Sequence, residues 1–190
     1  MSPRTEKQIK KLKQEKELLI LESALLLFSE KGFGNASMQS IAIRSKVSKG
    51  NLYNYFKSKE DLLEGVLRYG LNQMKELFYK QSTIHTEEDF LYTIRANFEM
   101  IKSNETFWKL YYNLVAQPKV YALFNKVFLP FFEQYMKLFE GYFKSKGDEN
   151  PAATALLLGS AIDGISLGYI MMGKDYPLEE VVNRLIEKFK

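Results

Sequence analysis

Residues 37–61 constrain the fold of this chain more than any other segment, because they predict two very short helices joined by a tight turn. Ser37 is a candidate N-cap for the first helix, and Ser48 is a candidate N-cap for the second. Leu52 and Phe56 are four residues apart, so they would share the inward face of the second helix. Two short helices with these caps predict a helix-turn-helix.

The outward face of the second helix is polar. It would carry Lys49, Gly50, Asn51, Tyr53 and Asn54, which are poor material for a hydrophobic core. Amides, a lysine and a tyrosine beside a glycine suit hydrogen bonds to base edges and phosphates in a DNA major groove. We therefore predict that this second helix contacts DNA.

The chain resembles the tetracycline-repressor (TetR) family in three strings, which are KGF at residues 31–33, SMQSIA at 37–42 and VSKGNLYNYFKSKEDLL at 47–63. The resemblance covers roughly residues 17–67. It implies an all-α fold of about nine helices, with an N-terminal three-helix DNA-binding domain over residues 1–57. Residues 58–190 would form a C-terminal helical domain for effector binding and dimerisation.

Two positions depart from the family pattern. Lys46 stands in the turn between the helices, where the family usually has glycine, and a left-handed lysine there would cost about 1–2 kcal/mol. Its side chain would then either approach a phosphate or remain solvated on a slightly different turn. Ala36 stands where the family often has threonine, so one phosphate-binding hydroxyl is expected to be missing.

The residues and the resemblance together predict the DNA contacts. The residues expected to face bases and nearby phosphates are Lys49, Asn51, Tyr53 and Asn54. The residues expected mainly to position the DNA backbone, by resemblance to the family, are Ser37, Gln39, Ser48, Tyr55, Lys57 and Lys59. The predicted set is Ser37, Gln39, Lys46, Ser48, Lys49, Gly50, Asn51, Tyr53, Asn54, Tyr55, Lys57 and Lys59. For Tyr55, packing inside the domain is an equally good interpretation.

Positive charge is concentrated near this motif. The formal net charge is +4, but residues 1–60 hold 12 Lys/Arg against 6 Asp/Glu, whereas residues 61–190 hold 15 against 17. A basic surface that coincides with the motif supports DNA binding, and the acidic remainder argues against a nonspecific architectural DNA protein. The basic lead-in at residues 1–16 would be either a frayed helical end or an arm that touches phosphates or the minor groove.

The residue inventory argues against catalysis and metal binding. The chain has no cysteine and one histidine, His85, so it lacks the ligands of a usual zinc site and the members of a Ser-His-Asp or Cys-His arrangement. No glycine-rich phosphate loop is present. We therefore predict no enzyme activity, no catalytic residues, no metal and no cofactor. The absence of cysteine and of an apolar signal core at the N-terminus predicts a cytoplasmic protein.

Helical patterns follow one another through the rest of the chain. A capped helix is expected from Ser58 to about residue 80, with others from Thr86 and Thr106, over 119–146 and 151–173, and from Pro177.

The 151–173 segment is long enough to span a membrane, but Asp163 at its centre makes that interpretation unfavourable. Small residues spaced by four predict close approach of another helix. We expect a homodimer, and the predicted interface residues are Ser160, Gly164, Gly168, Met172, Val182 and Leu185. The alternative is that the small-residue stripe packs within one subunit.

Aromatic residues crowd the C-terminal half, and the family resemblance implies a cavity among these helices. Most of these rings would be core, with Tyr111, Tyr112 and Asp163 as candidate polar anchors. The alternative for Asp163 is that it serves only as a dimer-interface or capping partner. The predicted ligand-binding set is Phe107, Trp108, Tyr111, Tyr112, Phe128, Phe131, Phe132 and Asp163. Because the C-terminal half of the chain lacks a basic cluster, we expect an apolar, aromatic or flat cationic effector rather than a phosphorylated one.

Two functions remain open from the sequence. The first is a ligand-responsive regulator, a repressor released from a palindromic double-stranded operator by a small apolar or aromatic effector. The second is a small-molecule-binding helical module with little specific DNA binding. The polar outward face with Lys49, Asn51 and Asn54 favours the regulator.

Overall fold

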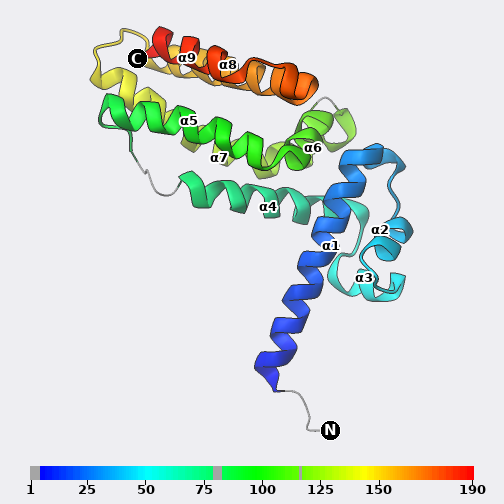
Figure 1. The fold of residues 1–190 in the computed structure, drawn as a ribbon. Coiled ribbons are helices and arrows are strands. Elements are labelled where there is room, and N and C mark those ends of the chain that lie inside the picture. Colours follow the sequence, from blue (N-terminus) through cyan, green and yellow to red (C-terminus); the bar gives the residue numbers. More distant parts are fainter. Residues whose placement is uncertain (1–4, 79–82, 116) are drawn as a thin grey trace.

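A computed structural model describes residues 5–78, 83–115 and 117–190, and within them every regular element is a helix (Figure 1). The elements are α1 (Glu6–Asn35), α2 (Met38–Arg44), α3 (Lys49–Tyr55), α4 (Lys59–Phe78), α5 (Glu87–Ser103), α6 (Glu105–Val115), α7 (Pro118–Ser145), α8 (Pro151–Met172), the 3-10 turn η1 (Gly173–Asp175) and α9 (Leu178–Phe189). The predicted all-α class is confirmed.

The short helices α2 and α3 begin at the predicted caps. The Ser37 hydroxyl accepts a hydrogen bond from the main-chain N–H of Ser40, and the Ser48 hydroxyl accepts one from Asn51, both at 3.1 Å. The N–H of Asp61 donates to the Ser58 hydroxyl at 3.0 Å, which confirms the predicted cap at the start of α4. Local hydrogen bonds therefore define all three starts.

Helix α1 turns toward α2 at Gly32. Its φ of 75° lies in the left-handed region, which glycine adopts without the steric cost that a Cβ would bring. The ring of Phe33 then folds back against Phe28, with ring centroids 5.3 Å apart. Helix α1 therefore contains a break at Gly32, three residues before its end at Asn35.

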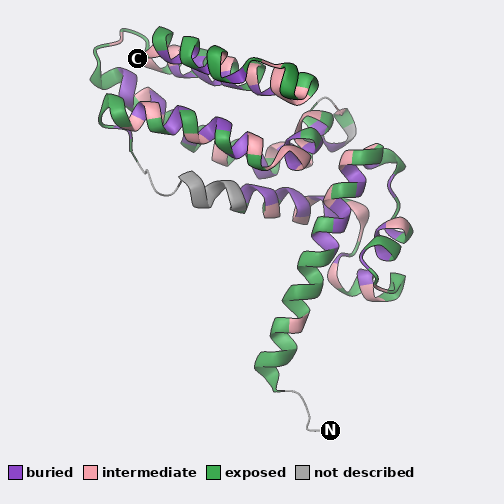
Figure 2. Ribbon diagram, in the orientation of Figure 1, coloured by how far each residue is buried: buried purple, intermediate pink, exposed green. Residues whose placement is uncertain are grey.

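The N-terminal part of α1 projects away from the rest of the chain, and its side chains are mostly exposed (Figure 2). A capping box between Thr5 and Gln8 starts the helix there. The predicted basic lead-in is therefore helical from Glu6 onward, while its residues 1–4 lie outside the described part of the chain.

The C-terminal helices stack in three tiers: α4 lies against α7 and α5, and α8 with α9 forms the outer tier (Figure 1). Aromatic rings fill the space between α5 and α7, where Phe90 stacks on Tyr142 with centroids 4.7 Å apart. One contiguous core joins these tiers to the helix-turn-helix.

Helix α8 leaves much of its apolar surface uncovered in a single chain. Among the described residues, the segment Pro151–Asp175 is the one helix long and apolar enough to cross a membrane, judged by length and composition. Leu157 is 63% exposed and Met171 is 76% exposed on this helix. An exposed apolar face of this kind is typical of an interaction surface.

Candidate DNA-binding surface and effector pocket

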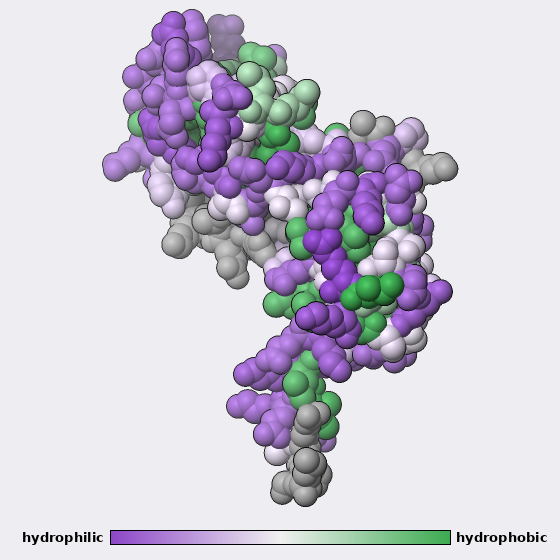
Figure 3. Space-filling model, turned by 45° about the vertical axis from the view of Figure 1, so that its right-hand side comes forward, coloured by the Kyte–Doolittle hydropathy of each residue, from purple (hydrophilic) through white to green (hydrophobic). Residues whose placement is uncertain are grey.

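Most of the predicted DNA-contacting residues lie on one exposed surface. Nine of them are exposed, namely Ser37, Gln39, Lys46, Ser48, Lys49, Gly50, Tyr53, Asn54 and Lys57, and three are half-buried, namely Asn51, Tyr55 and Lys59. Figure 3 views the molecule with this side turned forward, and hydrophilic residues cover most of its surface. A Cβ atom added at Gly50 would meet no other group within 4 Å, so the main chain at Gly50 is open to close approach by DNA.

A groove connects the start of α2 with α3 and with the turn before α4. The N-cap Ser37 and Gln39 of α2 line it, together with Lys49 and Tyr53 from α3 and Lys57 from the turn. Three separate segments of the sequence thus present hydroxyl, amide and ammonium groups to one concave surface. These are the groups that hold DNA phosphates in protein–DNA interfaces.

Tyr55 lies partly against the hydrophobic core. The packing interpretation therefore fits this residue better than a base or phosphate contact.

Lys46 adopts the left-handed conformation that its position in the turn suggested. Its φ is 54°, and it is the one non-glycine residue with positive φ in the described chain. The turn is held by the main-chain N–H of Val47, which donates to the carbonyl of Ala42 at 3.0 Å. The turn geometry is therefore kept at the expense of strain at Lys46.

Replacing Lys46 by glycine is expected to raise the free energy of unfolding by about 0.5–1 kcal/mol, because the strain exceeds the extra chain entropy of glycine. Thermal unfolding measures this. Lys49→Gly is the matched control, and it should destabilise because Lys49 is the first residue of α3, where glycine adds chain entropy without relieving strain. A Lys46→Gly variant less stable than the parent would contradict the strain argument.

Lys59 is used differently from the prediction. Its ammonium donates to the main-chain carbonyls of Phe33 (2.8 Å), Ala36 (3.0 Å) and Gly34 (3.3 Å). The same ammonium lies 4.5 Å from the centroid of the Phe33 ring. Its three N–H bonds all have protein acceptors, so Lys59 connects α4 to the α1–α2 turn and has no donor left for a phosphate.

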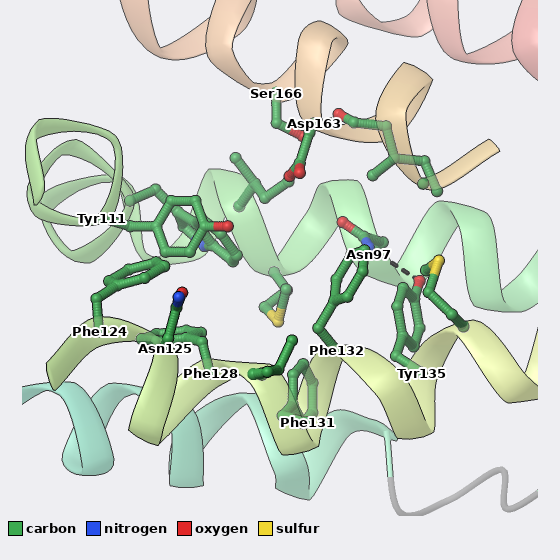
Figure 4. A pocket seen from close by; sticks show the side chains of 17 residues that line it. Asn97, Tyr111, Phe124, Asn125, Phe128, Phe131, Phe132, Tyr135, Asp163 and Ser166 are labelled. Atoms are coloured by element: carbon green, nitrogen blue, oxygen red, sulfur yellow. Dashed lines mark hydrogen bonds between the residues drawn. The ribbon is translucent and has the colours of Figure 1, made fainter. Parts of the chain in front are cut away.

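A cavity of about 270 Å³ lies between α5, α6, α7 and α8 (Figure 4). Its lining residues are Asn97, Met100, Ile101, Trp108, Tyr111, Phe124, Asn125, Phe128, Leu129, Phe131, Phe132, Tyr135, Met136, Gly159, Ile162, Asp163 and Ser166. Apolar walls with a few polar groups are typical of small-molecule sites. We call it the effector pocket.

Six of the eight predicted ligand residues line the effector pocket, and Phe107 and Tyr112 do not. Phe107 is buried beside α4 instead, because Gly70 leaves room for its ring there. Tyr112 donates its hydroxyl to the main-chain carbonyl of Asp163 at 3.3 Å and so connects α6 to α8.

The sequence did not single out the lining residues from α5 and the start of α7. Asn97 comes from α5 and donates its side-chain amide to the Tyr135 hydroxyl at 2.9 Å (Figure 4). A polar Asn97 on the otherwise apolar face of α5 was the available signal. Phe124 stacks on Phe128 with centroids 4.6 Å apart, and its spacing of four from Phe128 could have paired them.

Burial perturbs the ionisable groups around the effector pocket. Desolvation raises the pKa of Asp163 above its usual range, although a hydrogen bond with Tyr112 opposes this. Desolvation, with the nearby Asp163 charge as a second cause, also raises the pKa of Tyr111, so this phenol stays neutral at ordinary pH. Asp163 remains accessible to solvent on one side of α8, so its desolvation is partial.

Two contacts join the pocket helices to α4, which continues directly from the helix-turn-helix. A Cβ placed on Gly70 would lie 1.9 Å from Phe107 Cε2, so the ring of α6 packs directly on the α4 backbone. Glu64 on α4 accepts hydrogen bonds from Arg68 at 2.7 Å and from Lys126 of α7 at 2.9 Å. The hydrogen bond from Arg68, and to a smaller extent the one from Lys126, lowers the pKa of Glu64.

The predicted dimer residues divide into two groups. Ser160, Gly164 and Met172 are exposed, and a Cβ on Gly164 would meet nothing within 4 Å. Gly168 packs within the subunit, since a Cβ there would lie 2.6 Å from Tyr176 Cε2.

Val182 and Leu185 are only 3% and 8% exposed. The structure therefore assigns them to the core between α8 and α9 of one chain, because the apolar face of the amphipathic α9 turns toward α8.

Comparison with known proteins identifies the N-terminal domain. Residues 20–66 match the family described as bacterial regulatory proteins, tetR family. The uncharacterized HTH-type transcriptional regulator YuxN of Bacillus subtilis (strain 168) is 54% identical over 56 residues, which make up 30% of this chain and 19% of that relative. The alignment thus spans about a fifth of that protein's length.

Solved structures extend the likeness to nearly the whole chain. The fatty acid degradation regulator FadR from Bacillus halodurans has a TM-score of 0.78 at 18% identity and covers 92% of this chain and 94% of its own. FadR from Bacillus subtilis in complex with stearoyl-CoA has a TM-score of 0.77 at 18% identity, covering 90% and 96%. Residues 20–66 therefore match the tetR family of bacterial regulatory proteins, and the chain as a whole shares the fold of these solved structures.

Proposed function

We propose that this protein is a dimeric repressor that binds a palindromic operator and is released by a small apolar or aromatic effector. One observation carries the proposal: an exposed polar helix-turn-helix and an aromatic cavity occur in one chain and are joined through α4. In this division of labour residues 1–57 bind DNA and residues 58–190 bind effector and partner. The function is regulatory rather than enzymatic, and its place is the cytoplasm.

The mechanism follows from the contacts on α4. An effector that enters the cavity would change how α6 and α7 press on α4 through Phe107 and Lys126. Since α4 begins at the helix-turn-helix, the spacing of the two α3 helices in a dimer would change with it. The effector can release DNA only to the extent that it binds the second arrangement more tightly.

Two substitutions on the DNA-binding surface test the proposal. With an operator selected from random DNA by the parent protein, Asn51→Ala should reduce the ratio of operator to random affinity by about ten-fold or more, since a bidentate base contact is worth about 1–3 kcal/mol. Lys57→Met should weaken both DNAs alike and flatten the slope of log K against log salt by about 0.9 per phosphate contact.

The matched control is Lys137→Met, which removes one exposed lysine from α7, away from the helix-turn-helix. Fluorescence anisotropy at several salt concentrations gives both quantities. If the Asn51 and Lys57 variants bind like this control, the DNA-binding surface is misassigned, and the alternative of a small-molecule-binding module with little specific DNA binding is favoured.

Dimerisation through the exposed face of α8 gives a separate prediction. Gly164→Lys should dissociate the dimer, because a two-fold axis would bring two lysines into a close apolar interface. The space around Gly164 is open in one chain, so the subunit itself should fold normally. Gly141→Lys is the control, since Gly141 is exposed and equally open on α7. A sedimentation velocity experiment that finds both variants dimeric would remove this face from the interface.

A further inference from the structure

Asp163 is the one charged side chain among the residues that line the effector pocket, and these residues include no lysine, arginine or histidine. Its side chain extends from α8 toward the space bordered by the rings of α7 (Figure 4). The described residues around it supply a phenol, Tyr112, and no basic group. The cavity therefore has a negative charge without a protein counter-ion.

The Asp163 carboxylate is open to solvent on one side and borders the aromatic cavity on the other, with the Tyr112 phenol as its hydrogen-bond partner. The surrounding rings displace water from one side of it, which is why burial raises the pKa of Asp163. A positively charged ligand would offset the penalty, whereas an anionic ligand would increase it through like-charge repulsion.

The walls of the effector pocket suit the same charge. Ring centroids of Trp108 and Tyr111 are 5.0 Å apart, and those of Tyr111 and Phe124 are also 5.0 Å apart. The faces of such rings carry the negative part of the aromatic quadrupole and attract cations, most strongly where water is excluded. The cavity of about 270 Å³ accommodates a body of one or two rings.

We propose that the effector is a small hydrophobic organic cation, with its positive charge against Asp163 and its apolar body among the rings of α6 and α7. This inference rests on the proposed function, because it names the class of molecule that the effector pocket accepts. Three observations support it: one carboxylate at the pocket, an aromatic enclosure, and the absence of a competing basic side chain among the described lining residues.

A pair of isosteric probes tests the charge directly. Benzyltrimethylammonium carries a permanent positive charge, and neopentylbenzene has the same shape with carbon in place of nitrogen. The chain has one tryptophan, Trp108, and it lines the effector pocket, so intrinsic fluorescence reports binding there. In the parent protein the cation should bind at least about ten-fold more tightly than its neutral isostere.

Substitution of Asp163 then tests whether this residue causes the preference for the cation. Asp163→Asn should weaken the cation about ten-fold or more while changing the neutral isostere less than about two-fold. Asp175→Asn is the matched control, because Asp175 is an exposed aspartate just beyond the end of α8, and it should leave both affinities unchanged. The comparison of probes in the parent protein decides the question even if Asp163→Asn fails to fold.

Three results would overturn the inference. They are equal or weaker binding of the cation than of the isostere in the parent, an Asp163→Asn variant that keeps the cation's advantage, or saturable binding of hexadecanoyl-CoA with no binding of the cation. Because these measurements contain no DNA, they are independent of repression. A cation that binds through Asp163 without releasing the selected operator would contradict the proposed function and leave the ligand class standing.

Discussion

Replacing Gly70 by alanine is expected to lower the free energy of unfolding by about 1–3 kcal/mol, which is the usual cost of overpacking a well-filled core. The new Cβ would lie within 2.4 Å of three carbons of the Phe107 ring, and that ring is 4% exposed and has little room to move. Phe107 also contacts Phe128, at a centroid separation of 6.3 Å, so the displacement should reach the effector pocket. Thermal unfolding and Trp108 fluorescence would measure the two effects.

The control for Gly70→Ala is the same substitution at Gly141. That glycine lies in a helix with open space around its Cβ position, so alanine should stabilise it by about 0.5–1 kcal/mol through helix propensity. A second test is the double variant Gly70→Ala/Phe107→Leu, in which the smaller side chain should restore part of the loss. If Gly70→Ala stabilised the protein as Gly141→Ala does, α6 would not press on α4 at this point.

Replacing Lys59 by methionine is expected to lower the free energy of unfolding by about 2–3 kcal/mol, because carbonyls that accept from an ammonium lose strong hydrogen bonds. The three carbonyls lie between Phe33 and Ala36, and they would be left near the half-buried start of α4. For a chain of this length the melting temperature should fall by about 5–10 °C. The slope of DNA affinity against salt, measured well below that temperature, should stay close to the parent value.

Lys57→Met is the matched control for Lys59→Met, and we expect the opposite pattern from it. Lys57 is exposed, and its main-chain N–H, which the substitution keeps, donates to Asp61 at 2.7 Å. Its stability should therefore change by less than about 0.5 kcal/mol while its salt slope falls. A Lys59→Met variant with an unchanged melting temperature and a reduced salt slope would show that Lys59 neutralises a phosphate after all.

The helix-turn-helix could be predicted almost entirely from the sequence because its geometry depends on nearby residues. Ser37 and Ser48 each bond a main-chain N–H three residues later, so the caps are visible in a short string. The left-handed φ at Lys46 was one of the two turn geometries that the same local pattern left open. Lys59 was the exception, since its acceptors lie 23 to 26 residues earlier in the chain.

The effector pocket was predicted in its composition and only partly in its members. Aromatic crowding identified α6 and α7, but helical spacing does not tell which rings face a cavity and which face a neighbouring helix. Phe107 and Tyr112 flank Trp108 and Tyr111 in sequence, yet the rotation of α6 turns Phe107 toward α4 and engages Tyr112 with α8. Asn97 joins the pocket from another helix, a placement that only packing between distant segments decides.

The sequence by itself determined the all-helical class, the caps and turn of the DNA-binding domain, and the polar face of α3, because each depends on contacts within about one or two helical turns. Tertiary structure alone decided that Lys59 bonds the α1–α2 turn, that Val182 and Leu185 are internal, and that Asn97 lines the effector pocket. The physical reason is the same in each case. A helix exposes or buries a residue according to how it is rotated against its neighbours, and that rotation is set by the packing of side chains far apart in the chain.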